Sequence, residues 1–303
     1  MKKDFDSIPI STKTVIVETN LDLDINNLYD NLPISDYTLV PKKRGRRRGG
    51  VINDPNEHLE PGSIITLKYQ GNHRGVDLKK KKKEIQSKKY FRNALTVVMK
   101  IQNKSKNNLN EYKLINFKIS KNGKFQITGA KNDDNAKDCL GFFWKYVREF
   151  KEYQQIPELN IFCTNVMTNI DFPLGFLVDR QKLDMYLNEN TEYKSLLETS
   201  FGYTGVNIKV PLQNLHGYKI VNHIYDRNEN VKTNYINFED HYETLNPINQ
   251  KKYDDKVSYI TFLVFQSGNV IMSGMAKELM EPYYNNFWNI IDECRDIIIE
   301  KLD

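Results

Sequence analysis

The chain has 303 residues, of which 39% are hydrophobic and 12% aromatic, enough for one large or two ordinary domains with a sizeable core. The net charge of +5 is mild, but it is concentrated in two basic runs, residues 42–48 and 79–83. Such runs suit phosphate binding or form solvated loops, and the sequence leaves both readings open. No apolar segment is long enough to span a bilayer, so we expect no membrane association.

The three cysteines and five histidines are scattered along the chain. Their spacing matches no metal site and no disulfide framework, which predicts a reducing, intracellular location without a bound metal. We also find no nucleophile with an adjacent base and no glycine-rich phosphate loop. An enzyme is therefore the least favoured class, and no cofactor is expected.

The first half of the chain alternates apolar strands with polar connections. The pattern predicts strands at 12–19, 63–70 and 94–101, a hairpin at 113–128, and helices at 24–32 and 133–153. Residues 41–62 are basic and then rich in Gly, Asp and Pro, which favours a loop or insertion.

The second half repeats this order. We predict strands at 160–169 and 206–211, a helical stretch from Phe172 to about residue 186, a hairpin at 257–273 and a helix at 277–302. Residues 212–256 are polar and are expected to form an irregular insertion.

Two short stretches carry an internal repeat. Residues 122–129 and 267–274 each combine a turn glycine, a short strand, a hydroxyl residue and a second glycine, and each precedes a helix that contains one of the two tryptophans, Trp144 and Trp288. The repeat predicts two pseudo-symmetric units, at 1–155 with an insertion at 41–90 and at 156–303 with an insertion at 212–256.

Strand alternation assigns the two faces of each hairpin. The expected core residues are Phe117, Ile119, Phe125 and Ile127 in the first hairpin, and Ile260, Phe262, Val264, Val270 and Met272 in the second. The opposite face is polar in the first repeat and apolar in the second, where it carries Leu263, Phe265 and Ile271. An exposed apolar face needs a ligand, an insertion or a second protein to cover it.

The two hairpins resemble those of the TATA-box-binding proteins. Residues 122–131, Asn-Gly-Lys-Phe-Gln-Ile-Thr-Gly-Ala-Lys, follow the family motif closely, and residues 265–274 follow it well. The resemblance implies an α+β saddle, in which two repeats form a curved antiparallel sheet with helices on the convex face and DNA beneath the concave face. The long insertions and the Lys/Asn-rich composition resemble the divergent versions encoded by nucleocytoplasmic large DNA viruses. That origin would place the chain in a viral factory of the host cytoplasm, in the nucleus or in the virion.

The family bends DNA by wedging phenylalanines between base steps. The resemblance implies that Phe265 is one wedge, with Tyr203 as its partner and Phe201 as the less well aligned choice. Ser120 occupies the matching position in the first repeat, so that wedge is missing. Its partner is Phe91 if the strand register is shifted, although Phe91 in the core is an equal reading and Ala94 takes the literal position.

Other positions of this chain match the family pattern only in part. Asn165 matches the asparagine that reads A·T pairs in the second repeat, whereas the first repeat has Thr14 near that position. Groove-facing hydroxyls correspond to Thr128 and Ser273. The remaining candidates for the DNA-binding face are Gln126, Leu263 and Ile271, with Lys100, Lys209, Lys124 and Lys131 near phosphates or simply solvated.

The implied function is promoter recognition. The chain would bind the A·T-rich minor groove of double-stranded DNA, bend it, and recruit a transcription factor IIB-like protein and the RNA polymerase initiation complex, with no reaction catalysed. The alternative is a scaffold of the transcription machinery that has lost TATA specificity and binds DNA non-specifically or binds proteins.

Overall fold

The computed structural model describes residues 2–39, 54–78, 93–102, 112–197, 205–213, 215, 217–255 and 257–300. Within it the chain forms two compact units. The first-repeat unit comprises Val15–Cys163 and Asn222–Thr233, and the second-repeat unit comprises Met1–Thr14, Thr164–Val221 and Asn234–Asp303. Both basic runs, Phe91, Phe201 and Tyr203 lie outside the described residues.

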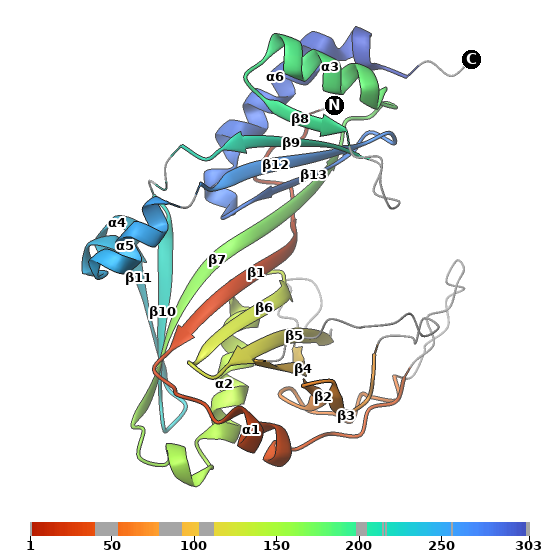
Figure 1. The fold of residues 1–303 in the computed structure, drawn as a ribbon. Helices are drawn as coiled ribbons and strands as arrows, with labels where there is room; N and C mark the ends of the chain where they lie inside the picture. Colours follow the sequence, from red (N-terminus) through yellow and green to blue (C-terminus); the bar gives the residue numbers. More distant parts are fainter. Residues whose placement is uncertain are drawn as a thin grey trace. The chain divides into compact units, whose positions relative to one another are not determined.

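The first-repeat unit is a helix-backed antiparallel sheet. Its elements are β1 (Ile10–Thr19), α1 (Ile25–Asn31), β2 (Ile64–Tyr69), β3 (Asn72–Gly75), β4 (Ala94–Gln102), β5 (Tyr112–Ser120), β6 (Lys124–Ala130), α2 (Asp133–Val147) and a short 3-10 helix, Lys151–Tyr153. The strand order is β3-β2-β4-β5-β6-β1, followed by the first part of β7. One face of the sheet packs under α2 (Figure 1).

The second-repeat unit uses the same sequence of elements. It contains β7 (Glu158–Pro173), α3 (Arg180–Asn190), β8 (Lys194–Leu197), β9 (Gly205–Pro211), β12 (Tyr259–Phe265), β13 (Asn269–Gly274), the 3-10 helix Lys277–Leu279 and α6 (Glu281–Ile298). Its strands follow the order β7-β13-β12-β9-β8, with the first residues of β1 beside β7. The helices α3 and α6 pack together on one side of this sheet (Figure 1).

The two units resemble each other even in the conformation of their hairpin turns. In each turn a glycine with positive φ, Gly123 at 66° and Gly268 at 75°, donates its N–H to the carbonyl three residues earlier, over 3.1 and 2.9 Å. Each of these glycines also accepts a backbone hydrogen bond, from Thr19 and from Leu174 respectively. A Cβ at either position would lie 2.0–2.1 Å from a carbonyl oxygen, so only glycine fits. The predicted α+β fold of two pseudo-symmetric repeats is confirmed.

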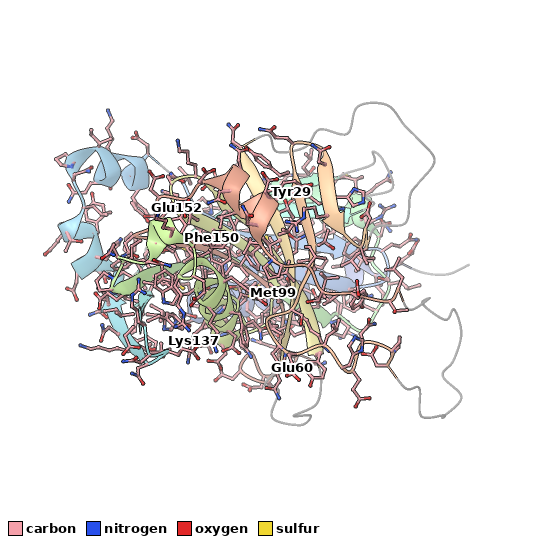
Figure 2. All side chains as sticks on the ribbon, turned by 90° about the horizontal axis from the view of Figure 1, so that it is seen from below. Tyr29, Glu60, Met99, Lys137, Phe150 and Glu152 are labelled. Atoms are coloured by element: carbon pink, nitrogen blue, oxygen red, sulfur yellow. The ribbon has the colours of Figure 1, made fainter. Side chains whose placement is uncertain are left out.

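Each core is a layer of aromatic and aliphatic side chains between sheet and helix. Phe143 of α2 packs edge-on against Phe125, with ring centroids 5.2 Å apart, and Phe287 of α6 stacks on Phe262 at 4.3 Å. All nine core residues predicted from the hairpins are buried. Figure 2 shows Met99 of β4 within the densely packed interior of the first-repeat unit, where it is fully buried.

Two predicted helix boundaries are wrong. Strand β7 continues to Pro173 instead of giving way to a helix at Phe172, and α3 begins only after Asp179, whose carboxylate accepts the N–H groups of Gln181 and Lys182. These bonds, led by that from Lys182, lower the pKa of Asp179. At its C-terminal end α2 stops at Val147, six residues before the predicted limit.

The insertion at 212–256 is ordered where an irregular segment was predicted. It forms β10 (Lys219–Asp226), β11 (Val231–Asn237), α4 (Phe238–Thr244) and α5 (Pro247–Asp254), and β10 pairs with both β11 and β7. The buried side chains Tyr218, Ile220 and Tyr225 explain why this polar segment folds, because they pack into the molecule while their neighbours remain solvated.

Candidate nucleic-acid interface

The open face of the second-repeat sheet, opposite its helices, gathers five of the predicted DNA-binding residues. Strand pairing places Leu263 beside Ile271 and Asn207, and places Ser273 and Lys209 on either side of Thr261. Leu196 and Asp171 extend the first of these rows at its two ends. The face therefore has a half-buried apolar centre, Leu263 and Ile271, with Leu196 63% exposed at one border.

Phe265 lies at the end of β12, on the same face. It borders a groove of about 620 Å³ that is also lined by Asp171, Pro173, Asn269 and Ile271. Its cross-strand partner is Gly205, where a Cβ would come within 2.7 Å of Leu263 Cδ1. Because Gly205 has no side chain, Leu263 has room beside it and no side chain rises from the surface next to Phe265.

Two lysines oppose each other on this face. Lys194 of β8 and Lys209 of β9 are direct cross-strand partners, and both are exposed. Residues paired in this way have Cβ atoms about 4.5–5.5 Å apart, and like charges there are destabilising. A pair that costs stability in the free protein is favourable once an anion binds between its members.

The open face of the first-repeat sheet differs, because the chain itself covers part of it. Leu59, Ile65 and Val98 form a separate small core there, with Tyr37, Val76, Leu78 and Leu114 packed against it. Lys100, predicted to contact phosphate, is only 2% exposed in this region. Its ammonium donates to the carbonyl oxygens of Asn56 (2.7 Å) and Leu59 (2.8 Å) and lies 3.9 Å from the Tyr112 ring centroid.

Lys100 is therefore a structural lysine, and its assignment to a phosphate-facing surface is corrected. Burial lowers the pKa of its ammonium, although nearby carboxylates, led by Asp54, oppose that shift. No sequence signal distinguished it from Lys209, since both occupy equivalent strand positions. The difference arises from the segment around Leu59, which covers Lys100, whereas no described segment covers Lys209, which is exposed.

The other predicted residues of the first repeat are spread over its surface. Gln126 is exposed and Thr128 is half-buried, with its hydroxyl directed to the carbonyl of Asn116 (3.2 Å). Lys124 is exposed and pairs with Glu18 at 2.6 Å, and Lys131 is exposed just before α2.

The two predicted readers of A·T pairs are constrained by their surroundings. Thr14 is buried, with 7% of its surface exposed. Asn165 is half-buried in β7, and its backbone N–H donates to the hydroxyl of Tyr218 at 2.8 Å, a contact supplied by the insertion. These two side chains are therefore less accessible to a ligand than the opposed lysines.

Part of the insertion docks on the first-repeat helix α2. The Tyr225 hydroxyl donates to the carbonyl of Lys137 (2.7 Å), and its ring lies so close to Gly141 that a Cβ there would be 2.9 Å away. Arg227 donates to the carbonyls of Tyr153 (3.0 Å), Gln154 and Ile156 (2.9 Å). The buried His223 bonds through Nδ1 to the Thr233 hydroxyl at 2.9 Å. These contacts fix β10 and β11 against the helix layer.

The described parts of the chain contain no cluster of three or more His, Cys, Asp or Glu side chains suited to a metal ion. Cys139, Cys163 and Cys294 are not joined in disulfides. Burial raises the pKa of the Cys294 thiol to about 11, so it stays protonated and unreactive at neutral pH. None of the helices, within the residues that the structure describes, is both long and apolar enough to cross a membrane.

The chain is similar in sequence to two viral proteins, one of which is described as TATA-box-binding protein-like. No protein-family model matches the chain. It is 28% identical over 224 aligned positions to a TATA-box-binding protein-like protein of Acanthamoeba polyphaga mimivirus, which covers 67% of this chain and 54% of that relative, about half its length. It is 26% identical over 309 aligned positions to uncharacterized protein 335L of Invertebrate iridescent virus 6, covering 97% of this chain and 86% of that protein.

Among solved structures, the TBP of Methanococcus jannaschii aligns with 94% of this chain and 98% of its own length, at a TM-score of 0.42 and 12% identity. The chain is thus similar in sequence to a TATA-box-binding protein-like protein, and its structure repeats one hairpin-and-helix unit twice. Both of these relatives are viral proteins.

Proposed function

We propose that the chain is a transcription initiation factor that binds and bends promoter DNA through the open face of the second-repeat unit. The observation that supports this most strongly is the composition of that face. It combines the apolar centre of Leu263 and Ile271 with Phe265 at the strand end and the opposed Lys194–Lys209 pair. Apolar contact with the floor of a minor groove and cationic contact with its phosphate borders require this arrangement.

Phe265 is the side chain suited to wedge between base steps. It is half-buried at the end of β12 and does not belong to the buried core of its unit, so it can contact a ligand without disturbing the packing under α6. Unstacking one base step costs a few kcal/mol, on the order of 2–4, which contacts over a wrapped surface offset. Its partner in this role would be Tyr203.

The proposal includes protein partners but no catalysed reaction. As the resemblance of the two hairpins to TATA-box-binding proteins implies, bound DNA would recruit a transcription factor IIB-like protein and RNA polymerase. Promoter recognition would favour A·T-rich sequence, to which Asn165, Ser273, Thr128 and Gln126 would contribute.

A scaffold function is the second candidate, and one observation favours it. The open face of the first-repeat sheet is partly filled by Leu59 and its neighbours, and the buried Lys100 cannot reach a phosphate there. A protein that used both repeats equally for DNA would leave both faces free. This candidate binds DNA weakly and without sequence preference, or binds other proteins of the transcription machinery.

Selection of bound duplexes from a random pool, followed by bend measurements on the selected sequences, separates the two. We expect an enriched A·T-rich motif and a bend that Phe265→Ala reduces more than it reduces the association rate, since the steering charges remain. The matched control is Tyr235→Ala, which removes a 69% exposed aromatic ring from β11. An unenriched pool, or equal bending in wild type and Phe265→Ala, would favour the scaffold.

A further inference from the structure

Among the described residues, the open face of the second repeat contains one carboxylate, and it lies at the groove beside Phe265. Asp171 is exposed near the end of β7, in register with Ile271, and lines the same groove of about 620 Å³. Among the described residues no hydrogen bond or ion pair engages its side chain. The opposed lysines lie on β9 and β8, three and four strands away from β7, or about 14 and 19 Å by the usual strand spacing.

An ionised carboxylate can only accept hydrogen bonds. In the minor groove an A·T pair presents only acceptors, adenine N3 and thymine O2, so Asp171 would face oxygen and nitrogen lone pairs there without a donor between them. A G·C pair adds one donor, the 2-amino group of guanine. That group is the single base-edge feature of the minor groove that satisfies a carboxylate, through a short charge-assisted hydrogen bond.

We propose that Asp171 is a specificity-determining residue that reads the 2-amino group of a guanine at the base step wedged by Phe265. This inference rests on the proposed DNA-binding function. It predicts that the bound site is A·T-rich but contains a required G·C pair under the second repeat. A CA/TG step satisfies both side chains, because pyrimidine–purine steps kink easily and this one carries a guanine.

The position of Asp171 is better suited to base reading than to backbone contact. A carboxylate placed among phosphates would be repelled, whereas the cationic border of this face is formed by Lys194 and Lys209 on the opposite strands. Asp171 also lies beside the apolar centre, since its direct neighbour in the sheet is Ile271. Sequence is read by contacts to base edges, and a side chain beside the apolar centre is nearer to those edges than the lysines at the cationic border.

The test uses duplexes that differ only in the 2-amino group. In the duplex selected by the wild-type chain, each guanine is replaced in turn by inosine, which lacks the group, and each adenine by 2,6-diaminopurine, which adds it. We expect one position at which inosine weakens binding by about 5- to 150-fold, the range for one specific base contact. An A·T pair at that position should weaken binding as well, and replacing its adenine by diaminopurine should restore the lost affinity.

Two variants and a control complete the design. Asp171→Asn should lose the preference and shift toward A·T pairs, because its amide can donate to adenine N3 or thymine O2. Asp171→Ala should bind both duplexes alike, with an unchanged salt dependence. Glu189→Ala, which removes an exposed carboxylate from α3, should keep the wild-type preference.

The outcomes separate this inference from the function on which it rests. Specific duplex binding that ignores the 2-amino group at every position overturns the role of Asp171 and leaves the DNA-binding proposal standing. Binding without any enriched sequence overturns the proposed function itself. A 2-amino preference that survives in Asp171→Ala assigns the contact to another residue and also overturns the inference.

Discussion

Replacement of Lys209 by glutamine should raise the stability of the free protein while it weakens DNA binding. Lys209→Gln keeps a polar side chain, one atom shorter, and removes one charge of the opposed pair with Lys194. Two unit charges 5 Å apart in water repel by about 0.8 kcal/mol, and the flexible side chains can separate, so the gain in unfolding free energy should be about 0.2–0.8 kcal/mol. The gain should shrink as salt screens the pair.

The effect on DNA has the opposite sign. Each phosphate contact contributes about 0.9 to the slope of log affinity against log salt concentration. If Lys209 makes one such contact, the variant loses that share of the slope. When salt rises from about 50 to 200 mM, the wild type should then lose about 3.5 times more affinity than the variant.

The assays are urea unfolding at two salt concentrations and fluorescence anisotropy on one duplex across a salt series. Lys182→Gln on α3 is the matched control, since Lys182 is exposed and pairs at 3.3 Å with Asp179. That variant should lose about 0–1 kcal/mol of stability and leave the salt slope unchanged. A Lys209→Gln chain that is no more stable than wild type and has the same slope would refute the reasoning that this pair is built for an anion.

Three further outcomes are expected. Ser120→Phe restores an aromatic at the first-repeat position equivalent to Phe265 and should increase the DNA bend, measured by fluorescence on the selected duplex; an unchanged bend would remove the equivalence of the two hairpin ends. Burial is the main cause that lowers the pKa of His223, so its contribution to stability is complete above the unfolded value of about 6.5 and is lost as pH falls toward the lower folded value. Urea midpoints between pH 5 and 7 should therefore fall less in His223→Asn than in wild type, and parallel curves would contradict this. Lys100→Met leaves the carbonyls of Asn56 and Leu59 without their donor and should cost about 1–3 kcal/mol by urea unfolding, where a neutral result would contradict its structural role.

The duplicated fold could be predicted because its determinants are local. The turn glycines require a backbone that only glycine adopts freely, and the alternation in both hairpins assigns one face of each to the core. Phe143 and Phe287 lie at equivalent places in α2 and α6, each against the aromatic side chains of its own hairpin. Such repeated patterns survive divergence that removes most sequence identity.

The errors arose where distant segments decide the environment. Lys100 and Lys209 have equivalent local sequence, and only the packing of Leu59 and its neighbours shows which of them is buried. Residues 219–226 were too polar to be recognised as a strand, because their pairing with β7 and β11 supplies the stabilisation that hydrophobicity does not. Asp171 was missed for a simpler reason, since the predicted strand ended at residue 169 and β7 continues to Pro173.

The two repeats pack alike on the helix side of the sheet and differently on its open side. On the helix side both must bury a hairpin under an aromatic-rich helix, and both do so with a phenylalanine of the helix against a phenylalanine of the hairpin, edge-on in the first repeat and stacked in the second. On the open side the first repeat places Leu59, Ile65 and Val98 in a core of its own, whereas the second leaves Leu263, Ile271 and Phe265 half-buried on a face that also carries exposed charged side chains. Burying an apolar centre of that kind is favourable by about 25 cal/mol per Å², so leaving it open is a cost that a bound partner removes. Binding can therefore gain free energy at the open face of the second repeat. Sequence preference should be concentrated in the half of the DNA site that contacts this repeat.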